Sequence, residues 1–194
     1  MKKSESLKVK VLQEISDGWL AQAEQCHSPH WDIREDCCNK EISLLVIHNI
    51  SLPAKQFGGQ YISDLFMGCL DENAHPSFKE IYQLRVSAHC LIRRDGHVIQ
   101  YVSFNERAWH AGVSSYKGRE KCNDFSIGIE LEGADDIPYT EEQYLILSQL
   151  TKTLIKQYPL IANNIAGHND IAPGRKTDPG ESFNWQQFKS LLDS

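Results

Sequence analysis

The sequence predicts an α/β protein with a single domain, in which helices flank a central mixed β-sheet. Apolar runs of strand length alternate with segments of helical periodicity along the whole chain. The length of 194 residues suits one domain with a sizeable core. The composition, 41% hydrophobic and 24% charged, is ordinary for a globular protein. Disordered and fibrous classes are therefore excluded.

The strands are indicated by apolar runs and by one turn signal. Residues 42–48 (ISLLVIH) form a continuous apolar run, which is typical of a central strand covered on both faces. Residues 88–94 and 97–103 flank Asp95-Gly96, a dipeptide that favours a two-residue type I′ hairpin turn. Further strands are expected at residues 126–131 (SIGIEL) and 161–167.

The helices are indicated by apolar spacing and by one capping motif. Thr140 and Gln143 form a capping box for a helix that runs to about Tyr158, where Pro159 ends it. A short helix is expected near residues 61–66, inside the mixed segment 51–86, which has the length of a binding loop. A closing helix with an apolar face is indicated by Trp185, Phe188, Leu191 and Leu192.

The charge pattern excludes two classes of partner. The net charge is −6 and no dense Lys/Arg stretch occurs, so nucleic acid is not an expected partner. No apolar run approaches the length of a membrane span. The early lysines are not followed by the apolar region of a signal peptide, so we expect a cytoplasmic protein. Its six cysteines are then expected to be free thiols: Cys26, Cys37, Cys38, Cys69, Cys90 and Cys122.

Three side chains suggest a catalytic zinc site. His48 ends the first apolar strand, His168 follows the short apolar run that ends at Gly167, and Asp178 lies in a loop rich in Pro and Gly. Two imidazoles and a carboxylate, with a fourth position left to water, are the ligands of an open zinc site. The alternative is that each histidine is an ordinary core or surface residue, because no compact motif joins the three.

Glu130 and Lys176 are the candidate catalytic pair. In SIGIEL, Glu130 shares a strand face with Gly128, whose missing side chain would leave room for a ligand. A carboxylate there would act as a general base. Lys176, two residues from Asp178, would help to hold a developing oxyanion. The alternative is a solvated strand face and a solvated loop lysine.

Two further residues suggest substrate contacts. Trp109 would stack on a sugar, although a tryptophan is more often a core residue. Arg85 would clamp a carboxylate, although a surface ion pair is the simpler role. His89 and Cys90 point to opposite faces of a strand, which excludes a Cys/His nucleophile pair.

Taken together, these residues resemble the N-acetylmuramoyl-L-alanine amidase type 2 family, in particular its cytosolic AmpD branch. The resemblance covers nearly the whole chain, from about Trp19 to Phe188. It therefore implies an amidase domain at residues 19–194, with the peptidoglycan-recognition-protein fold, after an N-terminal extension at residues 1–18. The blocks that carry it, in order, are LLVIHNISLP around His48, FGG at Phe57, RVSAHCLIRRDG from Arg85, RAWHAGVSSYKGRE from Arg107, CNDFSIGIELEG from Cys122 and GHNDIAPGRKTDPG from Gly167.

The resemblance also implies a chemistry. It implies one Zn²⁺ held by His48, His168 and Asp178, with Glu130 and Lys176 as the catalytic pair. The implied reaction is hydrolysis of the amide between the lactyl group of 1,6-anhydro-N-acetylmuramic acid and L-alanine, in the recycling of cell-wall muropeptides. Lys121 departs from the branch, which has an arginine at that position. The residues that correspond to substrate-binding positions are Asn49, Arg85, Trp109 and Ala172.

Two other functions compete with this expectation. One is a module that binds peptidoglycan fragments without cutting them, but such relatives typically lack one zinc ligand and this chain has all three. The other is an exported autolysin that acts on intact sacculi, which the missing signal peptide disfavours. We therefore expect a monomeric enzyme whose partner is a small soluble muropeptide.

Overall fold

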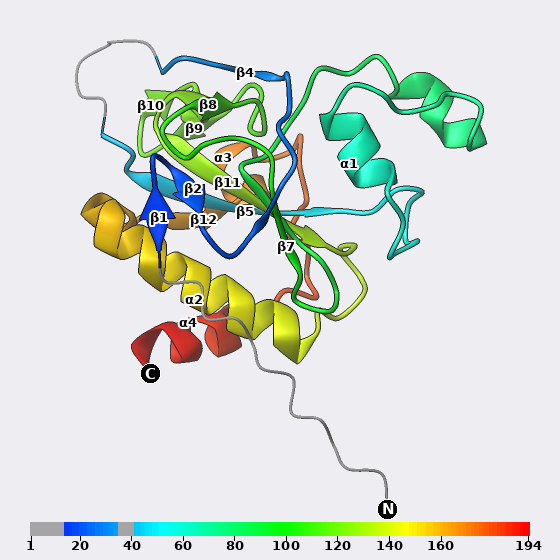
Figure 1. Ribbon diagram of the computed structural model, residues 1–194. Helices are drawn as coiled ribbons and strands as arrows, with labels where there is room; N and C mark the ends of the chain where they lie inside the picture. Colours follow the sequence, from blue (N-terminus) through cyan, green and yellow to red (C-terminus); the bar gives the residue numbers. More distant parts are fainter. Residues whose placement is uncertain (1–13, 35–40) are drawn as a thin grey trace, which may run out of the picture.

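The fold is built around a six-stranded mixed sheet (Figure 1). The structure is a computed structural model that describes residues 14–34 and 41–194. The strand order is β12-β5-β11-β6-β7-β3. Neighbours β12, β5, β11 and β6 run parallel, β7 is antiparallel to β6, and β3 is parallel to β7. The strands of this sheet are β3 Glu24–Gln25, β5 Leu44–Ile50, β6 Cys90–Ile92, β7 Val98–Gln100, β11 Ser126–Glu132 and β12 Ile165–Gly167.

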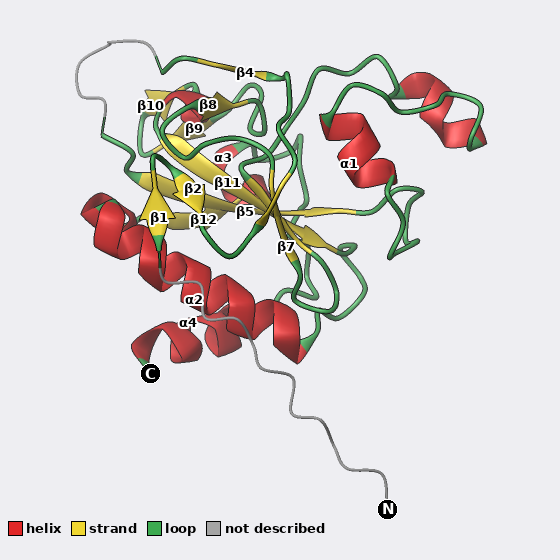
Figure 2. Cartoon of the chain, in the orientation of Figure 1, coloured by secondary structure: helices red, strands yellow, loops and turns green. Residues whose placement is uncertain are grey.

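The other described elements are short strand ladders, helices and 3-10 turns (Figure 2). Three two-stranded ladders lie outside the main sheet and pair β1 with β2, β4 with β8, and β9 with β10. Their bounds are β1 Ile15–Ser16, β2 Trp19–Leu20, β4 Trp31–Asp32, β8 Arg107–Ala108, β9 Ser115–Tyr116 and β10 Arg119–Glu120. The helices are α1 Tyr61–Phe66, α2 Glu141–Gln157, α3 His168–Ile171 and α4 Trp185–Asp193, with 3-10 turns η1 Pro76–Glu80, η2 Cys122–Asp124 and η3 Pro159–Asn163.

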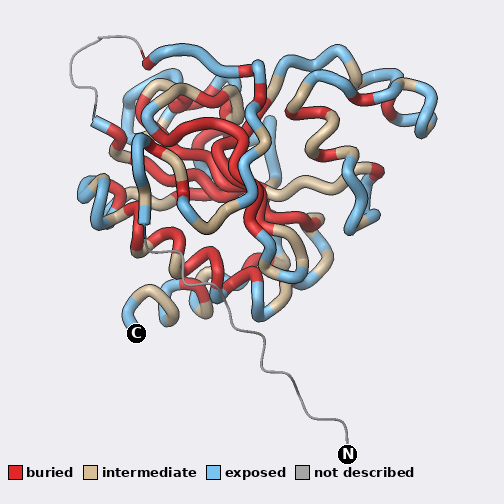
Figure 3. The backbone as a smooth tube through the Cα atoms, in the orientation of Figure 1, coloured by how far each residue is buried: buried red, intermediate tan, exposed pale blue. Residues whose placement is uncertain are grey.

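The central strands are buried on both faces, as the apolar run in β5 predicts (Figure 3). Leu45 and Ile47 of β5 join the core that lies under α2 and α4. Leu44 and Val46 point to the opposite face and pack with Ala111 and Cys122. Because side chains alternate along a strand, His48 belongs to this second face, away from the long helices. The expected α/β fold with a mixed sheet is confirmed.

The long helix α2 covers one face of the sheet. The expected capping box is present, because Thr140 Oγ1 accepts from the Gln143 N–H and Gln143 Oε1 accepts from the Thr140 N–H. Gln143 is fully buried and also donates to the carbonyls of Ile92 and Glu132. This cap therefore attaches the start of α2 to the ends of two strands. Helix α4 packs beside α2 (Figure 1), and its Phe188 is buried in the same core cluster as the apolar face of α2.

The hairpin between β6 and β7 is confirmed, but its turn is not type I′. That turn requires positive φ at both Asp95 and Gly96. Among the described residues Gly96 has φ 82° whereas Asp95 is not left-handed. The Gly96 N–H bonds to the Arg93 carbonyl, and the Arg93 N–H to the His97 carbonyl. The loop thus has three residues and ends on one left-handed glycine, the other common hairpin geometry.

The structure also tests the predicted helix near residues 61–66 and the predicted strand at residues 161–167. The short helix within residues 51–86 is α1, at the expected position. Strand β12 starts only at Ile165, because the preceding residues after Pro159 form the turn η3. Residues 1–13, on which the signal-peptide argument rests, and Cys37 and Cys38 lie outside the described residues. The boundary between residues 18 and 19 stays a prediction.

His89 should make the stability of this fold depend on pH. Its Nδ1 accepts from the Gly128 N–H at 3.0 Å, so it is held unprotonated. Burial, reinforced by the charge of Arg34, lowers the pKa of His89 to about 3 from its ordinary 6.5. Since the unfolded chain binds this proton more readily, stability is lost as the pH falls below 6.5. Each unit of lowered pKa corresponds to about 1.4 kcal/mol.

The variant His89→Asn keeps an acceptor near the Nδ1 position but has no proton to gain. We expect it to be less stable than the wild type at neutral pH, because packing is lost. The gap should narrow by about 2 kcal/mol between pH 6.5 and 5, since the wild type alone loses the contribution of this ring. Urea unfolding of both proteins across this range measures the gap, and parallel pH profiles would refute the assignment.

Candidate metal centre

Neighbouring parallel strands place the two candidate histidines side by side. His48 lies near the carboxyl end of β5, and His168 follows Gly167, the last residue of β12. Gly167 pairs with Ile47 in the parallel ladder, so the next residue of each strand emerges at the same edge. Ligands of open α/β sheets typically bind at this carboxyl edge. The third residue, Asp178, is brought back by a loop whose Asp178 carbonyl accepts from the Asn169 N–H.

The three side chains form a compact donor cluster. His48 Nδ1 lies 2.9 Å from His168 Nδ1 and 3.1 Å from Asp178 Oδ2. His168 Nδ1 lies 3.0 Å from the same carboxylate oxygen. The two imidazoles are buried, and the Asp178 side chain is 14% exposed. Residues 130 positions apart in the sequence therefore converge on one point that a metal ion would fit.

The hydrogen bonds around this cluster suit a cation. His168 Nε2 lies 3.1 Å from the Ala111 carbonyl, which only accepts, so the ring proton is on Nε2 and Nδ1 presents a lone pair. Burial lowers the pKa of His48 to about 4, so its ring is neutral at pH 7. Lone pairs and a carboxylate at this spacing repel one another unless a positive charge lies between them. The donor set of two imidazoles and one carboxylate fits zinc.

Glu130 lies beside this cluster without a compensating partner. It is the direct ladder partner of His48, because β11 pairs in register with β5. The residue is 9% exposed, and within the described part of the chain its buried Oε2 has no hydrogen-bond partner. Burial and the nearby charge of Asp178 raise the pKa of Glu130 well above its ordinary value, against the smaller opposite effect of Lys176. A solvated strand face, the alternative for this segment, is therefore wrong.

The expected role of Gly128 is wrong. The space above it holds the ring of His110, whose Cγ and Nδ1 lie 2.4 Å from where a Cβ would be. A ligand cannot occupy that volume, because protein already fills it. Glycine is required here for the close approach of the ring. Lys176 is exposed and acts on the cluster from solvent. Its positive charge makes a downward contribution to the pKa of Glu130 and of His48, although burial keeps the pKa of Glu130 raised.

The residues expected to contact substrate are spread around the cluster. The Trp109 ring lies nearly parallel to His30, and its buried Nε1 lacks a partner among the described residues. Asn49 is half-buried and donates to Asp135 Oδ1 at 2.8 Å. Arg85 is exposed. Ala172 is buried at the end of α3, where its carbonyl accepts from the Lys176 N–H.

An open pocket of about 590 Å³ is formed by segments that follow Ala111 and His168 in the chain, but the donor cluster itself does not line it. Ile171 and Ala172, which follow His168 in the chain, form part of one wall. Gly112 and Val113 also line the pocket, and they directly follow Ala111, whose carbonyl accepts from His168. The pocket also carries the side chains of Lys121 and Arg175. Glu120 lines it as well, so the pocket carries side chains of both charges.

Sequence reasoning missed two residues that support the cluster. His110 Nδ1 lies 2.9 Å from His48 Nε2, and Arg175 Nη2 donates to the Ala111 carbonyl at 2.6 Å. Both lie in blocks that the sequence analysis singled out, but neither was given a role. Their signal was weak, because His110 is 62 positions from His48 and the contact exists only in three dimensions.

The chain matches a family model described as N-acetylmuramoyl-L-alanine amidase over residues 39–181. It belongs to that family. It is 61% identical over 178 residues to the 1,6-anhydro-N-acetylmuramyl-L-alanine amidase AmpD of Citrobacter freundii, covering 92% of this chain and 94% of the relative. The AmpD of Escherichia coli K12 is 58% identical, with 92% and 96% covered. The resemblance to the AmpD branch is confirmed.

Solved structures agree with this membership. A crystal structure of a selenomethionine AmpD derivative superimposes with a TM-score of 0.90 at 60% identity, covering 93% of this chain and 99% of the other. The Escherichia coli amidase AmiD, solved with anhydro-N-acetylmuramic acid-L-Ala-D-γ-Glu-L-Lys, has a TM-score of 0.57 at 30% identity and covers 81% of this chain. This chain covers 59% of that structure.

The structure also bears on the predictions about membrane spans and cysteines. In the described part of the chain, no helix has the length and apolar character needed to cross a membrane. The cysteines described there, Cys26, Cys69, Cys90 and Cys122, are free. The rejection of a His89–Cys90 pair is confirmed, because Cys90 joins the core under α2 while the His89 ring contacts His110 on the other face.

The substitution Glu130→Gln should stabilise the metal-free protein. It replaces a buried carboxylate that lacks a compensating partner by a neutral amide of the same shape, so we expect the free energy of unfolding at pH 7 to rise by about 1–3 kcal/mol. The gain should shrink as the pH falls toward 4.5, the ordinary pKa of a glutamate, because the unfolded wild type then also binds the proton that the folded protein holds more tightly. Urea unfolding with chelator present measures it.

Glu132→Gln is the matched control on the same strand face. Glu132 is also buried, but its carboxylate accepts from the Gly58 N–H at 2.6 Å and the Arg94 N–H at 3.1 Å. Removing that charge should lower stability at pH 7. If both substitutions change stability in the same direction, the contrast between an orphaned and a satisfied carboxylate is wrong.

Proposed function

We propose that this protein is a zinc-dependent amidase of muropeptide recycling. The bond cut is the amide between the lactyl group of 1,6-anhydro-N-acetylmuramic acid and the L-alanine of the stem peptide. The observation that carries the proposal is the convergence of His48, His168 and Asp178 beside the unpartnered Glu130. The bond and the substrate class come from the names of the AmpD relatives. The AmiD complex with an anhydromuropeptide supports a small soluble muropeptide as the substrate.

The residues divide the chemistry between them. His48, His168 and Asp178 would hold the metal. Zinc, when bound, supplies Lewis acidity, which acidifies water and polarises a carbonyl. Glu130, whose pKa burial raises well above its ordinary value, takes a proton from the attacking water and returns one to the departing alanine nitrogen. The Lys176 ammonium stabilises the negative charge that develops on the carbonyl oxygen.

The remaining site residues would bind the substrate. Trp109 is half-buried and offers an apolar ring, which suits stacking on a sugar. Ala172, Asn49 and Arg85 would also contact the substrate, as the resemblance to the AmpD branch implies. All these residues come from one chain, so a monomer suffices. We place the reaction in the cytoplasm, where the free Cys26, Cys69, Cys90 and Cys122 would stay reduced.

Mass spectrometry of anhydro-N-acetylmuramyl-tripeptide incubated with the protein tests the reaction. We expect free tripeptide and anhydro-sugar, loss of both products with a chelator, and recovery with zinc, together with near-stoichiometric zinc in the purified protein. Intact substrate and no bound zinc would favour the module that binds fragments without cutting them. Release of peptide from insoluble sacculi as fast as from soluble muropeptide would favour the autolysin.

The substitutions Lys176→Ala and Glu130→Ala should separate metal binding from turnover. Each should retain zinc, because neither residue belongs to the donor cluster, and each should lose on the order of a hundred-fold or more in kcat. The control Lys156→Ala removes an exposed lysine of α2, on the opposite face of the sheet, and should change nothing. Wild-type kcat in either site variant would defeat the assignment of that residue.

A further inference from the structure

A chain of hydrogen bonds runs from a backbone carbonyl to the candidate metal ligand His48. Ser126 Oγ donates to the Cys122 carbonyl at 2.6 Å. His110 Nε2 lies 3.1 Å from the same Ser126 oxygen. His110 Nδ1, on the other side of the ring, lies 2.9 Å from His48 Nε2.

The carbonyl at the end of this chain decides where every proton lies. A carbonyl only accepts, so the one hydroxyl hydrogen of Ser126 points to Cys122. The Ser126 oxygen must then accept from a proton on His110 Nε2. A neutral imidazole carries one proton, so His110 Nδ1 is an acceptor. His48 Nε2 must donate to it, which leaves His48 Nδ1 as a lone pair directed at His168 and Asp178.

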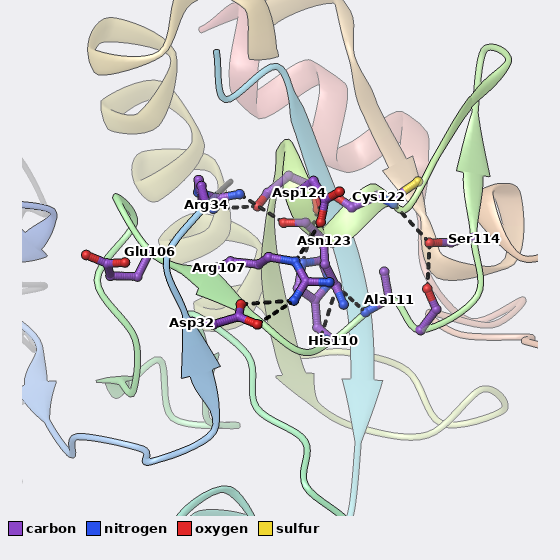
Figure 4. A network of polar contacts seen from close by, with 12 residues as sticks. Asp32, Arg34, Glu106, Arg107, His110, Ala111, Ser114, Cys122, Asn123 and Asp124 are labelled. Carbon is purple, nitrogen blue, oxygen red and sulfur yellow. Dashed lines mark hydrogen bonds and ion pairs between the residues drawn. The ribbon is translucent and has the colours of Figure 1, made fainter. Parts of the chain in front are cut away.

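The position of His110 is set by packing and by its backbone. The ring occupies the space above Gly128, where any Cβ would collide with it. The backbone N–H groups of His110 and Ala111 both donate to Asn123 Oδ1, at 3.2 and 2.8 Å (Figure 4). The Ala111 carbonyl accepts from His168 Nε2. The segment of His110 and Ala111, which Asn123 holds in place, therefore supplies the hydrogen-bond partner of the Nε2 atom of both His48 and His168.

We propose that His110 is a positioning residue that holds His48 as the Nε2–H tautomer and so presents Nδ1 to a metal ion. The inference rests on the proposed metal site for its function, but the tautomer itself is a property of the metal-free chain. Outer partners of metal-bound histidines fix ring orientation and tautomer, and their loss typically costs about 10–100-fold in metal affinity.

The test compares three variants. In His110→Asn, the side-chain oxygen takes the place of Nδ1 and keeps an acceptor for His48. His110→Leu fills a similar volume but accepts no hydrogen bond. His97→Leu is the control. It removes an exposed histidine that precedes β7 and bonds to Glu24, outside the donor cluster.

The first readout is 15N NMR of the histidine rings in the metal-free proteins. We expect His48 to be the Nε2–H tautomer in the wild type, in His110→Asn and in His97→Leu, and to shift toward Nδ1–H in His110→Leu. The same His48 tautomer in His110→Leu would overturn the proposal. This readout needs no metal, so it remains decisive if the wild type binds no zinc, a result that would defeat the proposed function instead.

The second readout is zinc affinity by competition with a chromophoric chelator. We expect His110→Leu to bind zinc about 10–100-fold more weakly and His110→Asn to recover most of this loss. Equal affinity in the wild type and His110→Leu would overturn the proposal. Equal weakening in the Leu and Asn variants would also do so, because it would show that packing rather than the hydrogen bond matters.

If circular dichroism shows that His110→Leu does not fold, the variant Ser126→Ala tests the same hydrogen-bond chain. It removes the acceptor of the His110 Nε2 proton while leaving both rings in place. His110 is then free to carry its proton on Nδ1, where it blocks donation from His48. We expect a mixture of His48 tautomers and weaker zinc binding, and a wild-type tautomer in this folded variant would overturn the proposal.

Discussion

The parallel, in-register pairing of β5 with β11 and β12 is the constraint on which the rest of the site depends. It makes Glu130 the direct neighbour of His48 and brings His168 out beside them. This pairing is held by strands buried on both faces, with one row of side chains under α2 and α4 and the other under the loops. A slip of one residue would turn each of these side chains to the opposite face.

A second layer of protein determines how the exposed ends of these strands are used. The segment from Trp109 to Ala111 lies over β11, where Gly128 admits the His110 ring. Asn123 holds its backbone, and the Ala111 carbonyl receives both His168 and Arg175. The ends of β5 and β12 place the candidate ligands His48 and His168, while this segment orients their rings. Glu130 is left without such a partner, which is the arrangement expected of a group that exchanges protons with a ligand.

Glu130 and Glu132 show how one strand face serves opposite purposes. Both acids are buried on the face that also carries Gly128, and the sequence pattern does not distinguish them. Glu132 receives two backbone N–H groups and fastens the loop at Gly58 and the hairpin at Arg94 to the sheet. Glu130 receives none of these bonds and lies beside the donor cluster. The difference arises from loops that are distant in the sequence.

The sequence by itself determined the local elements and the family. The apolar run of β5, the capping box of α2 and the ordered motif blocks depend on neighbouring residues, so they are readable from the chain. Only the tertiary structure decided the contacts across long separations. It placed His110 rather than a ligand above Gly128, gave the hairpin a single left-handed glycine, and joined His48 to Asp178 across 130 positions. Such contacts depend on how strands and loops pack in space, which residue spacing does not encode.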